Sequence, residues 1–370
     1  MCHAAVAKTV SKTVLAGFFL ASVWACSDSD SEPSVIVFSG EANRLNAYDA
    51  ESLAKQTVIP SRRDDPESGR DINAQICFFP DGSRRFIAGE DTGQPNPPQG
   101  WGVFQLHGSR VGELSATQIG KLSPTYQNSL DNAENYGCGF LSDGRLLTTD
   151  EGNQASGPNN GQLIIWFPPF DRSAEEQRYC KLDVTIGTAG GILVDPSDRI
   201  YVASARGGGI LRYTGPFPTS NDAAGGCGRK DDTGAPLADH LSRESFISDP
   251  TNVPTCGSIV QTPGGTFYVA SVLNGVIAEF DAEGRFLRRI LDPPTSTLPI
   301  PTGTPYGIAL DSRGTLYYAD IGLTISEGEF GPGRNLGTVR RIRFENGNPL
   351  PPETIDTGLN FPDGMGVLEE

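Results

Sequence analysis

A repeated unit of short apolar strands is the feature that most constrains this chain. Each copy has a glycine-rich entry, an apolar strand, a tight turn, and a second apolar strand that ends in a polar residue, followed by a third strand. Three copies are plain at residues 190–204, 257–271 and 306–320, and two more lie at 75–90 and 137–150. No helical period separates the copies, so the chain is predicted to be all-β.

The sixth copy is split between the two ends of the chain. Residues 363–368 (DGMGVL) read as a first strand with no second strand after it, and residues 35–41 (VIVFSGE) read as a second strand with no first strand before it. Pairing the two completes one unit and leaves no open sheet edge. The sequence therefore predicts a six-bladed β-propeller closed by pairing of the C-terminal strand with the N-terminal blade. The alternative is two unrelated terminal strands.

Composition agrees with one all-β domain over residues 35–370. The chain has 370 residues with 45 Gly and 28 Pro, which suit many short strands separated by turns. The formal net charge of −16 excludes nucleic acid as the expected partner, because cations are too few to neutralise phosphates. This charge favours a cation or a neutral ligand, or is simply an acidic surface that keeps the protein soluble. We expect a monomer.

The first 25 residues have the order of an export signal. Two lysines precede an apolar run at 14–24, which is followed by Ala25 and Cys26. The run is short for a membrane-spanning helix. With the acidic, serine-rich residues after Cys26, the segment resembles a bacterial lipoprotein signal. The resemblance implies acylation of Cys26, a tether at 26–34 and attachment at the outer membrane in the periplasm, with ordinary secretion as the alternative. Contact with the membrane is expected only through this lipid.

Five cysteines remain when Cys2 is removed with the signal and Cys26 is assigned to lipid. They are Cys77, Cys138, Cys180, Cys227 and Cys256. In an oxidising compartment up to two disulfides can form, with one thiol left over. Cys180 and Cys227 flank the fourth blade in loop-like or outer-strand sequence and are the predicted pair, whereas Cys77 and Cys138 lie on inner strands of adjacent blades. The sequence has no CxxC pair and no Cys/His cluster, so a structural zinc site is not expected.

Oxygen-bearing side chains recur at strand ends that a propeller brings to one mouth of its channel. The second strands end in Glu41, Glu90, Asp150, Ser204, Ser271 and Asp320. The first strands begin near Asn73, Asn135, Thr188, Pro254, Thr304 and Phe361, with Asp363 two residues on. Oxygen donors without His or Cys suit a hard divalent cation. Alternatively, these acids accept hydrogen bonds from the following loops, which is the role favoured for Asp320.

Other chemistries have less support from the sequence. Only His107 and His240 remain outside the signal, too few for histidine-based iron or haem sites. Asp239, His240 and Ser242 are the residue types of a hydrolase triad, but neighbours in sequence do not make the required geometry. Several aromatic residues near the mouth either stack on a flat ligand or fill gaps between blades: Trp101, Trp166, Tyr136, Tyr306 and Phe361.

The blades resemble those of the SMP-30/gluconolactonase family and of NHL repeats. The resemblance rests on residues 189–204 (AGGILVDPSDRIYVAS), 305–320 (PYGIALDSRGTLYYAD) and 361–368 (FPDGMGVL), and it spans nearly all of 35–368. It implies a divalent metal in the channel that polarises a carbonyl and activates water, held by a Glu, Asn residues and an Asp. The matching donors here are Asn73, Asn135 and Asp363, with Glu41 or Glu90 nearby.

Two functions are therefore expected. The first is a metal-dependent lactone or ester hydrolase with Asp363 and Glu90 as catalytic residues and Ca²⁺ as the first candidate metal, ahead of Mg²⁺ or Zn²⁺. Its predicted metal ligands are Asn73, Asn135, Asp363, Glu41, Glu90 and Asp150. The second is a non-catalytic module that binds a partner at the cell envelope through the long loops 91–99, 151–160 and 321–336. The expected ligands are accordingly a small neutral molecule, a sugar lactone or carbohydrate, or an envelope protein.

Overall fold

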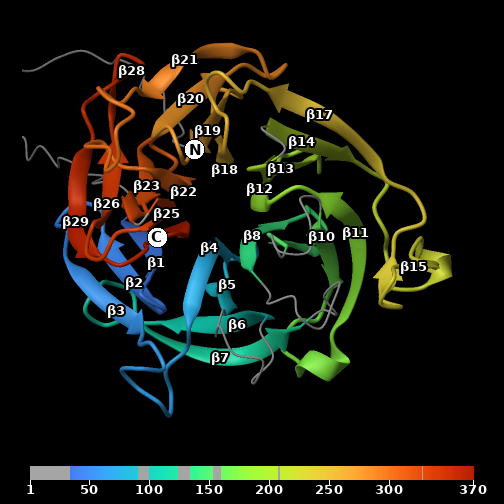
Figure 1. Ribbon diagram of the computed structural model, residues 1–370. Helices are drawn as coiled ribbons and strands as arrows, with labels where there is room; N and C mark the ends of the chain where they lie inside the picture. The colour runs from blue at the N-terminus through green and yellow to red at the C-terminus, as the bar shows by residue number, and fades with distance from the viewer. Residues whose placement is uncertain (1–33, 91–99, 124–133, 153–159, 207–208, 327) are drawn as a thin grey trace, which may run out of the picture. The chain divides into compact units, whose positions relative to one another are not determined.

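The computed structural model arranges the chain as six β-sheets around a central axis (Figure 1). It describes residues 34–90, 100–123, 134–152, 160–206, 209–326 and 328–370, and Ser34–Glu370 forms one compact unit. This confirms the predicted all-β six-bladed propeller. The predictions for the signal and for Cys26 lie outside the described residues, as does most of the loops 91–99 and 151–160. Within the described ranges, no helix is long and apolar enough to cross a membrane.

The first three blades follow one another along the chain. Blade 1 contains, from the outer edge to the axis, β3 (Lys55–Ile59), β2 (Arg44–Asp49), β1 (Val35–Glu41) and β30 (Met365–Glu369). Blade 2 contains, from the axis outward, β4 (Ile72–Phe78), β5 (Arg85–Glu90), β6 (Gly100–His107) and β7 (Ser115–Leu122). Blade 3 contains β8 (Asn135–Phe140), β9 (Leu146–Asp150), β10 (Gly161–Phe167) and β11 (Arg178–Ile186), extended by β16 (Pro236–Leu237) and β15 (Arg229–Lys230).

The remaining three blades have the same order from axis to edge. Blade 4 contains β12 (Ala189–Val194), β13 (Ile200–Ser204), β14 (Gly209–Thr214) and β17 (Ser242–Ser248). Blade 5 contains β18 (Cys256–Gln261), β19 (Phe267–Ser271), β20 (Val276–Phe280) and β21 (Phe286–Leu291). Blade 6 contains β22 (Pro305–Leu310), β23 (Leu316–Asp320), β26 (Gly337–Ile342) and β29 (Glu353–Leu359), with a small hairpin of β24 (Leu323–Ser326) and β25 (Glu329–Pro332).

The two ends of this unit close the ring by pairing with each other. Strand β30 is antiparallel to β1, with Val37 opposite Val367 and Ser39 opposite Met365. Beyond the strands, the backbones of Ser34 and Glu370 exchange two hydrogen bonds of 2.9 and 3.0 Å. The predicted joining of the C-terminal strand to the N-terminal blade is therefore present, and it removes the open edge that blade 1 would otherwise have.

Glycines let the innermost strands approach one another closely at the axis. A Cβ added to Gly364 would lie 1.4 Å from the carbonyl oxygen of Ala74, and one added to Gly190 would lie 2.4 Å from that of Gly257. No residue with a side chain fits at such a distance from a neighbouring backbone. The glycines at the start of these innermost strands are thus needed because the blades meet there.

Large apolar side chains fill the spaces between neighbouring sheets. Phe86 and Phe104 stack with ring centroids 5.2 Å apart in the core between blades 1 and 2. Trp101 and Trp166 are buried in the core between blades 2 and 3, with exposed fractions of 1% and 0%. These two tryptophans therefore have the gap-filling role that was one of the two expectations for them.

Two disulfides join parts of the propeller. Cys180 on β11 is bonded to Cys227, the pair expected from the sequence, and this bond ties the segment between β14 and β17 to blade 3. The same segment is held by a buried ion pair of 2.6 Å between Lys181 and Asp231. The second disulfide joins Cys77 on β4 to Cys138 on β8. Cys256 is the remaining buried thiol of the described residues.

The close approach of blades predicts a large effect of one methyl group. Gly364→Ala should lower the free energy of unfolding by about 3 kcal/mol or more, because the new Cβ overlaps the Ala74 carbonyl and β30 must shift. The control is Gly264→Ala, where the nearest atom to an added Cβ is Thr262 Oγ1 at 3.7 Å. Urea denaturation measures both variants. Equal stability of Gly364→Ala and the parent protein would contradict the packing described here.

Candidate functional site

A cavity of about 270 Å³ lies where the innermost strands of several blades begin. Asn73 comes from β4, Asn135 and Tyr136 from β8, and Tyr306 from β22. The full set of lining residues is Asn73, Glu134, Asn135, Tyr136, Glu151, Tyr306, Phe361 and Asp363. Three of the six side chains predicted to hold a metal, namely Asn73, Asn135 and Asp363, therefore line one cavity.

Asp363 is positioned by the backbone around it. Its Oδ1 accepts a hydrogen bond of 2.7 Å from the Gly364 amide, and its Oδ2 accepts one of 3.2 Å from the Ala74 amide of blade 2. The side chain is buried. These two amide donors orient the carboxylate.

The strand β4 bends so that Asn73 lines the cavity. The pairing of β4 with β5 is irregular between Asn73 and Cys77, and Ala74 has a left-handed φ of +74°. Phe361, two residues before Asp363, also has a left-handed φ, of +53°. Left-handed backbone costs free energy for residues other than glycine and is common at binding sites. The bulge and the two strained residues set the directions in which the cavity side chains point.

Two glycines let the amide side chains lie close together. A Cβ added to Gly89 would be 3.1 Å from Asn73 Oδ1 and 3.2 Å from Asn135 Cβ, so both asparagines pack against this glycine. A Cβ added to Gly40 would be 3.0 Å from Asp363 Oδ1. Asn135 Nδ2 donates a hydrogen bond of 2.9 Å to the Gly100 carbonyl, which fixes which end of this amide is the oxygen.

The carboxylates predicted from the second strands lie elsewhere. Glu41, Glu90 and Asp150, which were also predicted as ligands, are not among the described residues that line the cavity. Glu41 and Glu90 directly follow Gly40 and Gly89, and successive strand residues point to opposite faces. Because the glycines face the side chains of Asn73, Asn135 and Asp363, the glutamates point away from those side chains.

Each of these three acids has partners of its own. Glu90 is buried, accepts a hydrogen bond of 2.9 Å from the Gln118 side chain and forms an ion pair of 3.3 Å with Lys121. Glu41 accepts a hydrogen bond of 3.0 Å from the backbone amide of Asn360, and Asp150 accepts one of 2.9 Å from the backbone amide of Glu134. They therefore stabilise strand ends and loops, which was the alternative stated for this set. Asp320 has the stabilising role that the sequence favours for it, because it accepts hydrogen bonds of 2.7 Å from the Thr304 amide and 2.9 Å from the Gly322 amide.

Two tyrosines from opposite blades meet at the cavity. Tyr136 of blade 3 and Tyr306 of blade 6 stack with ring centroids 4.2 Å apart and an interplanar angle of 27°. The Tyr136 hydroxyl donates 3.0 Å to the Asp363 carbonyl, and the Tyr306 hydroxyl donates to the Glu151 carboxylate. Burial raises the pKa of the Tyr136 phenol well above its usual value, and the charges of Asp363 and Glu151 raise it further. Tyr136 is therefore a neutral hydrogen-bond donor at any ordinary pH.

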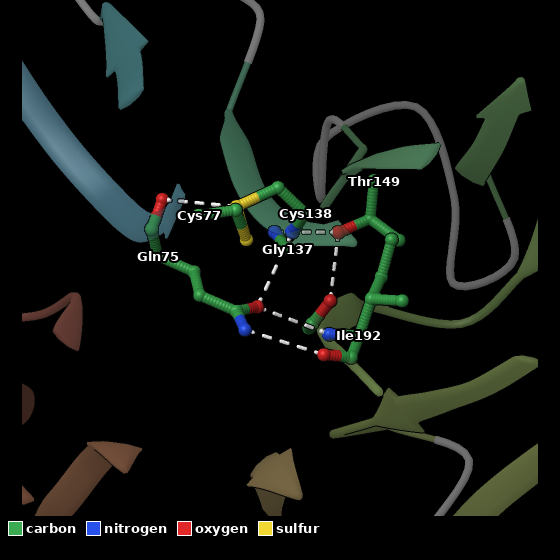
Figure 2. Close-up of a disulfide and its surroundings, with 7 residues drawn as sticks. Gln75, Cys77, Gly137, Cys138, Thr149 and Ile192 are labelled. Carbon is green, nitrogen blue, oxygen red and sulfur yellow. Dashed lines mark hydrogen bonds between the residues drawn. A yellow bond between two sulfur atoms is a disulfide. The ribbon is translucent and has the colours of Figure 1, made fainter. Parts of the chain in front are cut away.

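Gln75 and a disulfide connect the strands that carry the asparagines (Figure 2). Gln75 Oε1 accepts bonds of 3.2 Å from the amides of Cys138 and Ile192, and its Nε2 donates 3.2 Å to the Ile192 carbonyl. One side chain of blade 2 thus contacts blades 3 and 4. The Cys77–Cys138 bond joins the same two strands, β4 and β8, that supply Asn73 and Asn135.

The donors fit a hard cation only if the amides take part. Asp363 supplies one carboxylate, Asn73 and Asn135 supply amide oxygens, and Glu134 and Glu151 add acidic groups to the lining. In the described ranges, no group of three or more His, Cys, Asp and Glu side chains is close enough to hold a metal ion. A cation in this cavity would therefore depend on Asn73 and Asn135.

Glu134 and Glu151 were not assigned to the site from the sequence. Glu151 follows Asp150 directly, and alternation places two adjacent acids on different sides of the chain. The sequence signal for Glu151 is therefore this pair of consecutive acids, and the pair alone does not indicate which of the two lines the cavity. Glu134, next to Asn135, carried no separate signal.

No protein-family model and no curated protein sequence matches this chain. Among solved structures, a luciferin-regenerating enzyme is 13% identical, with 90% of this chain and 99% of that chain covered and a TM-score of 0.51. A chain of a nidogen/laminin complex is 11% identical, with 90% and 98% covered and a TM-score of 0.52. A calcium-binding regucalcin from Agrobacterium tumefaciens is 16% identical, with 75% of each chain covered and a TM-score of 0.47. The first two support the propeller fold, and such low identities do not extend to activity.

Removal of the Tyr136 hydroxyl tests the bond that holds Asp363. Tyr136→Phe should lower the free energy of unfolding by about 2 kcal/mol, because the buried Asp363 carbonyl loses its donor. Tyr318→Phe is the matched control, since its hydroxyl donates 2.8 Å to the Thr302 carbonyl away from the cavity. Both should lose similar stability in urea denaturation. An unchanged midpoint for Tyr136→Phe alone would show that its hydroxyl does not hold the segment before β30.

Proposed function

We propose that the cavity binds a divalent cation and hydrolyses a small neutral lactone or ester. The observation that carries this proposal is that Asn73, Asn135 and Asp363 come from three blades and line the same cavity. These are the donors that the resemblance to the SMP-30/gluconolactonase family implies. Ca²⁺ is the first candidate, because hard oxygen ligands that include amide groups suit it, with Mg²⁺ or Zn²⁺ as alternatives.

The chemistry follows from the residues that line the cavity. A bound cation would supply Lewis acidity toward the carbonyl oxygen of the substrate. Asp363 accepts a proton from the attacking water, whose oxygen forms a bond to the carbonyl carbon. The bond between that carbon and the ring or ester oxygen then breaks, and the departing oxygen takes up the proton that Asp363 accepted. The stacked Tyr136 and Tyr306 form an aromatic wall that excludes bulk water from one side of the substrate.

The site is proposed to act outside the cytoplasm. The two disulfides of the described residues support an oxidising compartment, as does the export signal in the sequence. We propose a periplasmic protein held at the outer membrane through acylated Cys26. The proposal for the cavity does not depend on this attachment.

A non-catalytic binding module is the second candidate. It is favoured by the hairpin β24–β25, where Ile325 and Phe330 are exposed to solvent on the insertion of blade 6. Such a module would need no cation and no proton acceptor. The two candidates therefore differ in their dependence on Asn73, Asn135 and Asp363.

Cation binding should be visible as stabilisation. At a concentration of 100 times the dissociation constant, a cation that binds only the folded protein adds about 2.7 kcal/mol to the free energy of unfolding. Asn73→Ala and Asn135→Ala should remove this gain, whereas Glu283→Gln, an exposed acid on the outer turn of blade 5, should keep it. Thermal unfolding with Ca²⁺, Mg²⁺, Zn²⁺ or chelator measures the effect. If no cation shifts the transition of the parent protein, the metal part of the proposal is wrong.

Loss of the proton acceptor should remove hydrolysis. Asp363→Asn should lower kcat for a simple lactone by about 100-fold or more, because general base catalysis contributes at least that much. Circular dichroism verifies that the variant is folded, since Asp363 also accepts two backbone bonds. Glu90→Gln is the informative comparison: it removes a buried charge outside the cavity, so it should lower stability with little effect on kcat of the folded protein. Undiminished hydrolysis in Asp363→Asn would place the chemistry elsewhere.

A further inference from the structure

Four exposed apolar side chains lie on two adjoining chain segments, one of which lines the cavity. They belong to the segment before β30 and to the insertion of blade 6, and their exposed fractions are 39% for Phe361, 43% for Leu336, 54% for Ile325 and 62% for Phe330. We call these four residues the apolar ledge. Phe361 belongs both to the apolar ledge and to the cavity, which it also lines.

Hydrogen bonds hold the ledge against the cavity. The Asn335 amide donates 2.9 Å to Asn360 Oδ1, and Asn360 Nδ2 donates 3.1 Å to Asn335 Oδ1. Leu336 and Phe361 are the next residues after this pair. A Cβ added to Gly337 would lie 2.3 Å from Pro362 Cδ, so the two segments are in direct contact. The insertion is therefore continuous with the edge of the cavity.

The hairpin that carries the outer part of the ledge is anchored at its base. Leu323 is buried, and its amide donates 3.0 Å to Thr304 Oγ1, while the Gly333 amide donates 2.8 Å to the Gly322 carbonyl. Ile325 and Phe330 are directly opposed in the pairing of β24 and β25, so their side chains lie on the same face of the ribbon. A two-stranded ribbon is marginally stable alone, and apolar groups at its end gain free energy when another molecule covers them.

The size of the cavity indicates what covers the ledge. About 270 Å³ is slightly below the range for pockets that enclose a whole drug-sized ligand. The cavity can hold a small ring, and Phe361, which lines the cavity and is partly exposed, offers an apolar surface to a substituent on that ring. The net charge of −16 opposes an anionic membrane surface as the alternative occupant.

We propose that the apolar ledge binds an alkyl or aryl substituent of the substrate. This inference rests on the proposed function and specifies its substrate class: a neutral lactone or ester with an apolar side chain, in preference to a polyhydroxylated sugar lactone. The carbonyl end lies among Asn73, Asn135 and Asp363, and the apolar end lies over Phe361, Leu336 and the hairpin. Ile325 and Phe330 determine specificity and take no part in the chemical step.

A series of γ-lactones with increasing alkyl length tests the ledge. From γ-butyrolactone to γ-decalactone, kcat/KM should rise by about fourfold for each methylene that the ledge fully covers. In the double variant Ile325→Ser, Phe330→Ser this rise should largely disappear, while γ-butyrolactone is hydrolysed at the parent rate. The matched control is Phe286→Ser, Leu287→Ser, which removes two exposed apolar side chains from β21 at the outer edge of blade 5. It should leave the whole series unchanged.

Binding of unreactive 2-alkylcyclopentanones separates failure of the ledge from failure of the hydrolase. Calorimetry should show affinity that rises with chain length in the parent protein and in the β21 control, and a flat series in the hairpin variant. If that pattern is found without lactone hydrolysis, the ledge inference stands and the hydrolase proposal fails. If lactones are hydrolysed but chain length has no effect, or glucono-δ-lactone is preferred, the ledge inference is wrong and the hydrolase remains. A flat ketone series together with a protein partner that the hairpin variant no longer binds would also overturn the inference, in favour of a docking surface.

Discussion

The antiparallel pairing of β30 with β1 is the interaction on which the rest of the structure depends. It closes the ring, and it also fixes the residues just before β30, where Phe361 and Asp363 line the cavity. Glu41 at the end of β1 accepts a hydrogen bond from the Asn360 amide, so the closing strand and the cavity segment are held by the same blade. A closed ring is therefore the condition for Asp363 to face Asn73 and Asn135. Stability and the candidate site cannot be separated here, because the one segment 361–369 both closes the ring and lines the cavity.

Close packing at the axis explains why the site is a cavity at one mouth of the channel. Glycines bring neighbouring backbones together, and the Gln75 side chain of blade 2 forms hydrogen bonds with blades 3 and 4. Tyr136 and Tyr306 stack from opposite blades. These contacts leave room for a ligand where the first strands begin. The residues there belong to blades 1, 2, 3 and 6, so the ring contributes unequally although its blades repeat.

Much of the fold could be predicted from the sequence, because the apolar pattern and the ends of each strand depend on residues that are neighbours in the chain. The polar residues that end the second strands, from Glu41 to Asp320, are the last residues of β1, β5, β9, β13, β19 and β23. The first-strand donors Asn73 and Asn135 could be predicted for the same reason. Which acids line the cavity could not be predicted, because this depends on which face of a second strand is turned toward the cavity. Gly40 and Gly89 lie on that face, so the glutamates that follow them lie on the other. Glu151 and the Cys77–Cys138 bond depend on contacts between distant segments, which a single sequence does not specify.

The charge of the cavity is consistent with a neutral substrate and an anionic product. Glu134, Glu151 and Asp363 bring negative charge to a site in a protein whose formal charge is already −16. A neutral lactone or ester enters such a site without electrostatic cost, whereas an anionic substrate would be repelled. The proposed hydrolysis would produce a carboxylate, which the same side chains would repel. The acidic lining would therefore favour product release, and the apolar ledge would supply the affinity that charge cannot give to an uncharged substrate.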